Sequence, residues 1–121
     1  MKYFSTKLPV KDLEYSSEFY TKTLGLPVTC HYGHSILLDN HLLLTTKETP
    51  GSGKVCIYLE AKEYYKTEAK LLAIGHSPDY RYSPAGQRIM ILRDPEGNNV
   101  EIGESMGQIV TELLSLSKYS G

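Results

Sequence analysis

Glu101 is the acidic side chain best placed to do chemistry in this chain of 121 residues. It alternates with Val100 and Ile102 in a segment of strand type, so its carboxylate points into a concavity if those two neighbours face a layer of helices. A carboxylate there can bind a cationic ligand, or act as a base if burial raises its pKa. It can equally form a structural ion pair with Arg88 or Arg93 on a neighbouring strand.

Arg88 and Met90 have the same parity in the strand predicted at 88–93, so we expect them on one face of a sheet. A guanidinium in a pocket suits the recognition of a carboxylate or a phosphate, and a cross-strand ion pair is an equally good interpretation. By the same alternation, Ser5 and Lys7 lie on the polar side of an N-terminal strand, where both can donate a hydrogen bond to a ligand oxygen. For Lys7, a solvated position is the favoured interpretation.

Histidine side chains are the next candidates for chemistry. His31 lies inside a predicted strand, on the face opposite to Cys30, and is therefore a candidate pocket residue. His34 and His41 fall at predicted turns or strand starts, and His76 follows a helix end, so these three are interpreted as surface residues.

Charge and hydropathy restrict the partners. The 13 basic and 14 acidic residues are interspersed and leave a net charge of −1, so no broad positive field exists and nucleic acid is not expected as a partner. The chain has no run of about 18 apolar residues and its first residues lack the pattern of a signal peptide, which predicts no membrane contact and a cytoplasmic location. Cys30 and Cys56 are too few for a disulfide framework and are interpreted as buried thiols.

The order strand, helix and three strands occurs twice along the chain. The predicted elements are strand 3–10, helix 12–23 and strands 28–32, 35–38 and 41–46 in the first half, then strand 55–59, helix 61–74 and strands 79–82, 88–93 and 99–102 in the second. Asp12 can cap the first helix. A shift of 50 residues places Tyr15 on Tyr65 and Gly25 on Gly75, which indicates two similar modules.

Segments of other composition flank these modules. The segment 48–53 is rich in turn-forming residues and predicts a linker between modules at about 3–46 and 54–103. Apolar spacing near the C-terminus predicts an amphipathic helix at about 107–118, which would cap the sheet or contact a partner subunit. The length favours a single domain, residues 1–121.

Two motifs carry a resemblance to a known family. The segment Leu8–Leu26 resembles the first strand and helix of the vicinal oxygen chelate superfamily, and the segment Arg93–Ile102 resembles its closing hairpin. This superfamily includes glyoxalases, bleomycin-resistance proteins and extradiol dioxygenases. The resemblance implies an α+β fold in which two βαβββ modules form a curved mixed sheet around a cleft, with helices on the outer face. It also implies a homodimer.

The resemblance further implies where a metal would bind. The four strand positions correspond here to Ser5, to Leu44 or Thr45, to Val55 and to Glu101. Only the carboxylate is a good ligand for a divalent ion, because valine and leucine have no donor atom and neutral hydroxyls bind weakly. We therefore expect no metal and no other cofactor.

The favoured hypothesis is a metal-independent, dimeric protein similar to the bleomycin-resistance proteins, which binds a small and partly apolar molecule in its cleft. The residues expected to line the cleft are Ser5, Lys7, Val55, Ile57, Arg88, Met90 and Glu101, with His31 as a further candidate. One alternative is a glyoxalase-like lyase or related isomerase with Glu101 as its catalytic residue, assisted by His31. A second alternative is an interaction domain whose pocket is filled by its own side chains.

Overall fold

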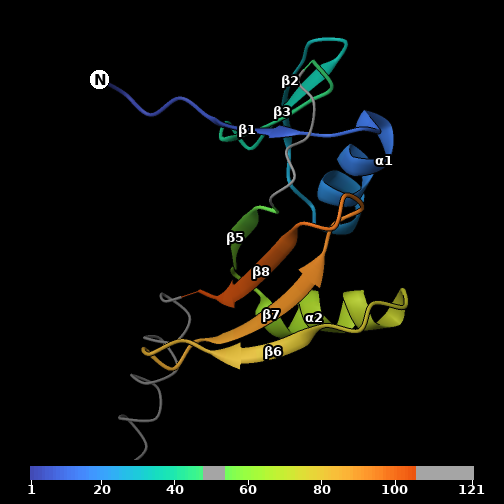
Figure 1. Ribbon diagram of the computed structural model, residues 1–121. Helices are drawn as coiled ribbons and strands as arrows, with labels where there is room; N and C mark the ends of the chain where they lie inside the picture. The colour runs from blue at the N-terminus through green and yellow to red at the C-terminus, as the bar shows by residue number, and fades with distance from the viewer. Residues whose placement is uncertain (48–53, 106–121) are drawn as a thin grey trace, which may run out of the picture. The chain divides into compact units, whose positions relative to one another are not determined.

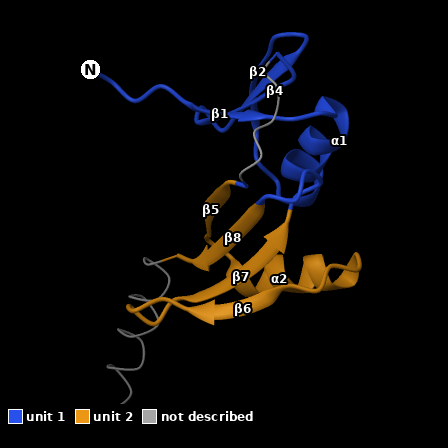
Figure 2. Ribbon diagram, in the orientation of Figure 1, with its two compact units in different colours: residues 1–54, 94–98 blue, residues 55–93, 99–121 orange. Residues whose placement is uncertain are grey.

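The structure is a computed structural model that describes residues 1–47 and 54–105. The chain divides into two compact units, which Figure 2 colours separately. The first contains Met1–Lys54 and Asp94–Asn98, and the second contains Val55–Arg93 and the chain from Asn99 onward. Each unit has a four-stranded mixed sheet of its own.

The first unit contains β1 (Thr6–Pro9), α1 (Leu13–Glu18), the π-helical segment η1 (Phe19–Thr23), β2 (Val28–His31), β3 (Ser35–Leu38) and β4 (Leu42–Thr45). Its strands lie in the order β1-β4-β3-β2, with β1 parallel to β4 and the other neighbours antiparallel. Asp12 begins α1, because its side chain accepts a hydrogen bond of 3.0 Å from the backbone N–H of Tyr15. Gly25 follows η1 with a φ of +80°, a conformation that glycine adopts without strain.

The core of the first unit lies between α1 and its sheet. Leu8, Leu44 and Ile36 are paired across β1, β4 and β3, and all three are buried. The helix contacts β3 and β4, so this row of side chains lies beneath it. Lys7 alternates with Leu8 and therefore points to the opposite face of the sheet.

The second unit contains β5 (Cys56–Ala61), α2 (Tyr64–Ala73), β6 (Asp79–Tyr82), β7 (Arg88–Arg93) and β8 (Asn99–Glu104). The strand order β5-β8-β7-β6 repeats that of the first sheet (Figure 1). Again the first strand in the chain, β5, is parallel to the last, β8, and the other neighbours are antiparallel. The predicted α+β fold with two βαβββ modules is therefore confirmed. Met90, Val100 and Ile102 are buried, and α2 contacts β8.

A buried carboxylate organises the turn between β7 and β8, which belongs to the first unit. Asp94 Oδ1 accepts the backbone N–H groups of Glu96 and Asn98 at 2.9 and 2.8 Å. Its Oδ2 accepts the Tyr20 hydroxyl at 2.6 Å, and both residues are buried. Burial, together with the neighbouring Asp94 carboxylate, raises the pKa of Tyr20 far above its ordinary value, so the phenol remains a hydrogen-bond donor. This bond ties the turn to the helical segment η1.

The predicted elements are present, and their ends differ by a few residues. The first strand begins at Thr6 and the second helix at Tyr64, each later than expected from the sequence. The predicted linker at 48–53 and the predicted helix at 107–118 lie outside the described residues. Among the described residues, no helix is long and apolar enough to cross a membrane. One curved sheet that joins both modules around a cleft stays a prediction.

Replacing Tyr20 by Phe removes the hydroxyl from the buried Asp94 carboxylate. We expect the free energy of unfolding to fall by about 1.5–3 kcal/mol, because a hydrogen bond to a charged group contributes about that much. Urea unfolding at pH 7 measures the change. Tyr15→Phe is the matched control, since Tyr15 is exposed and its substitution should change stability by less than about 0.5 kcal/mol. Equal effects of the two substitutions would contradict the role given to the Tyr20–Asp94 bond.

Candidate functional site

The second sheet has two faces of different character. Arg88 on β7 is bonded to Glu68 of α2, so Met90, which has the same parity, also faces the helix. Met90 is paired with Ile102 on β8, and Glu101 therefore points to the opposite face. By strand register, the side of Glu101 is shared by Cys56 and Tyr58 of β5, Arg81 of β6, Ile91 of β7 and Gly103 of β8. We call Glu101 and these five residues the Glu101 face.

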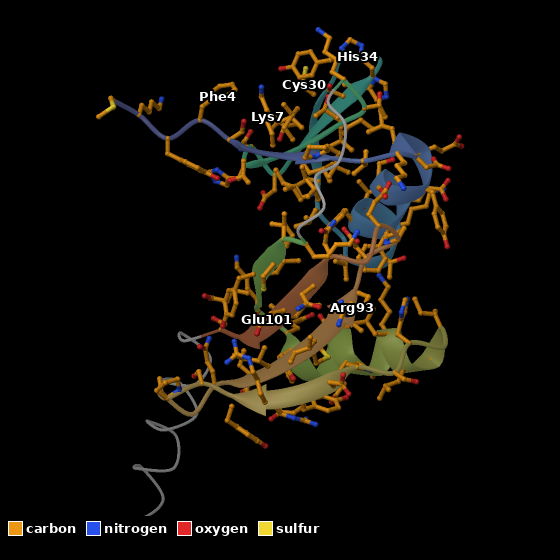
Figure 3. The ribbon with its side chains drawn as sticks, in the orientation of Figure 1. Phe4, Lys7, Cys30, His34, Arg93 and Glu101 are labelled. Atoms are coloured by element: carbon orange, nitrogen blue, oxygen red, sulfur yellow. The ribbon has the colours of Figure 1, made fainter. Side chains whose placement is uncertain are left out.

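Glu101 is bonded to side chains from two other strands. Its Oε1 accepts a hydrogen bond of 2.7 Å from Arg81 Nε and forms an ion pair with Arg81 Nη2. Its Oε2 accepts a hydrogen bond of 2.8 Å from the thiol of Cys56. The side chain of Glu101 is 15% exposed and that of Arg81 is 47% exposed. Both oxygens of this half-buried carboxylate are therefore engaged. Figure 3 labels Glu101 on the second sheet.

These contacts determine the protonation of the group. The hydrogen bond from Cys56 and the nearby Arg81 guanidinium lower the pKa of Glu101 below that of an ordinary glutamate. The same bond to Glu101 raises the pKa of the Cys56 thiol. At neutral pH the carboxylate stays ionised and the thiol stays protonated. The arrangement therefore provides a poor base and a poor nucleophile, but a well-defined set of hydrogen-bonding groups.

Tyr58 lies beside Glu101 on the neighbouring strand, and its position depends on Gly103. A Cβ atom at Gly103 would collide with the Tyr58 hydroxyl, so the glycine makes room for the ring. The hydroxyl contacts Gln87 Oε1 at 3.3 Å, and Gln87 Nε2 donates to the backbone carbonyl of Glu104 at 2.6 Å. The ring is nevertheless 49% exposed. It offers an aromatic surface that is held in place at its hydroxyl end.

Arg88, predicted as a pocket residue, lies on the α2 side of the sheet. Its Nη2 forms an ion pair of 3.2 Å with Glu68 Oε2, and its guanidinium lies 4.4 Å from the centre of the Tyr80 ring. The expectation that Arg88 shares a face with Glu101 is wrong. The expected ion pair between Glu101 and a residue of β7 is also replaced, since Glu101 pairs with Arg81 on β6.

Three further predicted residues of this unit are apolar. Met90 is fully buried on the α2 side. It is paired with Ile102, and successive residues of a strand point to opposite faces, so Met90 lies opposite to Glu101. Ile57 is paired with the buried Val100 and therefore also faces away from Glu101. Val55 precedes β5 and is 39% exposed.

Ser5, Lys7 and His31 belong to the first unit. Lys7 is exposed on the sheet face opposite α1, and Ser5 precedes β1 with the same parity. His31 is paired with Ile36, whose side chain lies on the α1 side, so His31 does not share the face of Lys7. The Nδ1 atom of His31 accepts the backbone N–H of Gly33 at 3.1 Å. A pocket that joins these residues to Glu101 stays a prediction.

A family model described as a Glyoxalase-like domain matches residues 4–107. The chain belongs to this family. Together with solved structures of the glyoxalase, bleomycin resistance and dioxygenase superfamily that share the fold, this match confirms the predicted vicinal oxygen chelate superfamily. No curated protein matches the chain.

Three solved structures illustrate the similarity of this glyoxalase-like protein to others. A protein of unknown function from Agrobacterium tumefaciens is 21% identical with a TM-score of 0.73, over 88% of this chain and 95% of that one. A lactoylglutathione lyase from the same species is 23% identical with a TM-score of 0.71, over 84% and 92%. TnmS3, an antibiotic binding protein from a Streptomyces species, is 21% identical with a TM-score of 0.67, over 86% and 95%. At these identities the similarity shows the fold alone.

The side chains of this glyoxalase-like protein do not fit the divalent ion used by some members of the superfamily. At the corresponding positions, Val55 has no donor atom and Ser5 has only a neutral hydroxyl. Thr45 Oγ1 is 2.7 Å from the Ser35 hydroxyl, and both oxygens of Glu101 are engaged. In residues 1–47 and 54–105, no three His, Cys, Asp or Glu side chains form a cluster that suits a metal ion.

Arg81 and Cys56 are candidates that the sequence did not reveal. The strand 88–93 is almost continuously apolar, so alternation does not tell which of its residues face the helix. Arg81 could have been found only from the pairing of Tyr82 with Arg88, which places Arg81 on the side away from Arg88. Cys56 was expected to be buried, which is wrong, because it is exposed on the Glu101 face.

Replacing Glu101 by Gln removes the charged acceptor that keeps the Cys56 thiol protonated. The pKa of Cys56 should fall toward that of an ordinary cysteine, and alkylation by iodoacetamide at pH 8 should become about 3- to 10-fold faster. Mass spectrometry of timed digests, with Cys30 as internal reference, measures the rate. Glu60→Gln is the control, because it removes an exposed carboxylate from β5, the strand of Cys56, without changing the Glu101–Cys56 pair. If Glu101→Gln and the control alkylate at the same rate, the hydrogen bond does not control the thiol.

Proposed function

We propose that this glyoxalase-like protein binds a small, partly apolar molecule on the Glu101 face, without a metal ion and as a homodimer. The observation that carries the proposal is the engagement of both Glu101 oxygens by Arg81 and Cys56. A general base works best with a pKa near the operating pH, whereas this carboxylate is held in its charged form. Such a group orients its neighbours and serves binding.

The surroundings of Glu101 suit a ligand with an apolar part. Tyr58 presents a half-exposed aromatic ring, and Ile91 is half-buried on the same face. Sites for small molecules combine apolar surface with a few fixed polar groups, and Arg81, Cys56 and Glu101 are the fixed polar groups here. TnmS3, an antibiotic binding protein, shares the fold, and the proposal assigns the same broad class of function to this chain.

A lyase reaction, as in the similar lactoylglutathione lyase, makes a different demand on this face. Glu101 would have to accept a proton or hold an ion, and each role requires that Arg81 or Cys56 be released first. A ligand-binding role requires no such change. The contacts of Glu101 therefore favour binding.

The proposal predicts where a neutral aromatic probe binds. Titration of the full, uniformly ¹⁵N-labelled chain with 2-naphthamide in reducing buffer should shift the amide resonances of Cys56, Tyr58 and Glu101 more than that of Met90. Tyr58→Ala should weaken binding about 5- to 10-fold, because a stacked aromatic pair contributes about 0.5–1.5 kcal/mol beyond the area it buries. Tyr65→Ala is the matched control.

Tyr65 suits this control because it is 50% exposed, almost as much as Tyr58 at 49%, but lies on α2. Its substitution should leave the affinity unchanged within about twofold. Shifts that centre on α2, or equal losses in the two variants, would show that the Glu101 face is not the binding site.

A further inference from the structure

Arg81 extends across the sheet to reach Glu101. It is paired with Ile89 of β7, and Glu101 lies on β8, so one whole strand separates the two backbones. Neighbouring strands are about 4.8 Å apart, which places β6 and β8 roughly 10 Å from one another. The arginine side chain therefore lies over β7, with its guanidinium near the middle of the Glu101 face.

Only one edge of this guanidinium is used. Both Nε and Nη2 are directed at the same carboxylate oxygen of Glu101. An arginine has five N–H donors in a planar fork, so donors on the other edge, including those of Nη1, remain available. In the described part of the chain, the side chain of Arg81 has no hydrogen-bond or ion-pair partner other than Glu101. This side chain is 47% exposed. The group is thus oriented by one partner and has room for a second.

Arg88 provides the comparison within the same sheet. It is 27% exposed, both of its terminal nitrogens contact Glu68, and its guanidinium also lies against the ring of Tyr80. That guanidinium is committed to packing α2 on the sheet. Of these two arginines, Arg81 is the one with free donors on the Glu101 face.

Charges near Arg81 allow an anionic group at its free edge. Glu101 is shielded by the guanidinium on one oxygen and by the Cys56 thiol on the other, which limits its repulsion of a second carboxylate. Asp79 of β6 and Glu60 of β5 share this side by register, and both are exposed, so solvent and salt screen their charges. A planar fork matches the two oxygens of a carboxylate better than a single amide oxygen.

We propose that Arg81 is the residue that sets specificity on the Glu101 face, and that it selects a ligand that carries a carboxylate beside an aromatic or aliphatic part. This inference rests on the proposed binding function and names its ligand class. The carboxylate of the ligand lies on the free edge of the Arg81 guanidinium, and the apolar part of the ligand contacts Tyr58. Glu101 acts as a positioning residue, because it fixes the guanidinium without touching the ligand.

Two probes of the same shape test the proposal on the full, labelled chain. 2-Naphthoate carries a carboxylate where 2-naphthamide carries a neutral amide. NMR titration at pH 7 follows the Arg81 Nε–H resonance and the amide of Glu101. We expect the naphthoate to bind at least about tenfold more tightly than the naphthamide and to shift the Arg81 resonance, since paired charged hydrogen bonds are the stronger kind.

Arg81→Gln should abolish this preference, because the affinity for 2-naphthoate should fall at least about tenfold relative to the affinity for 2-naphthamide. Arg81→Lys keeps the charge without the fork and should retain only part of the preference. Lys66→Gln is the control for net charge, because Lys66 is exposed on α2 and pairs with Glu63, and it should leave the preference intact. The amide spectrum of each variant confirms that it is folded.

The outcomes separate the two proposals. Equal affinity of the native chain for both probes, or a preference that persists in Arg81→Gln, overturns the assignment of Arg81 and leaves the binding function standing. Absence of binding by both probes on this face contradicts the binding function and, with it, this inference.

Discussion

The hydrogen bonds that Glu101 accepts from Arg81 and Cys56 are the interaction on which the chemistry of the second sheet depends. They join three strands of one sheet, and they are possible because β8 is an inner strand with β5 on one side and β7 on the other. An ion pair with one half-exposed partner contributes little to stability, about 0–1 kcal/mol. Its importance lies in orientation, since it fixes the guanidinium and keeps the carboxylate charged.

The packing of α2 decides which residues can take part in that interaction. The helix covers the side of the sheet that carries Met90, Val100 and Ile102, and leaves Glu101 on the other. Arg88, on the helix side, is drawn into contacts with Glu68 and so cannot assist Glu101. Position along each strand therefore decides which side chains can act together with Glu101. Successive residues of a strand point to opposite faces, so a shift of the register by one residue would move a side chain to the other face.

Much of the fold could be predicted from the sequence because its signals are local. The cap at Asp12, the glycines that follow the helices and the repeat of strand and helix patterns each depend on a few neighbouring residues. The face of Glu101 was predictable for the same reason, since it alternates with two apolar residues. The face of Arg88 was not, because β7 is apolar along most of its length, and the partner of Glu101 depends on a long side chain that reaches across a strand.

The chain is similar in fold to both a lyase and an antibiotic binding protein, and this similarity does not decide between their activities. The donor groups of this chain must decide between them. The central claim is that Glu101 is bonded to Arg81 and Cys56 and therefore does not bind a metal ion. Native mass spectrometry of the tag-free protein, titrated with Ni²⁺ or Zn²⁺ and then with a chelator, tests this claim most directly. We expect the mass of a dimer without a stoichiometric ion. One chelator-sensitive ion per chain that disappears in Glu101→Gln would contradict it and make a metal-dependent lyase the better explanation.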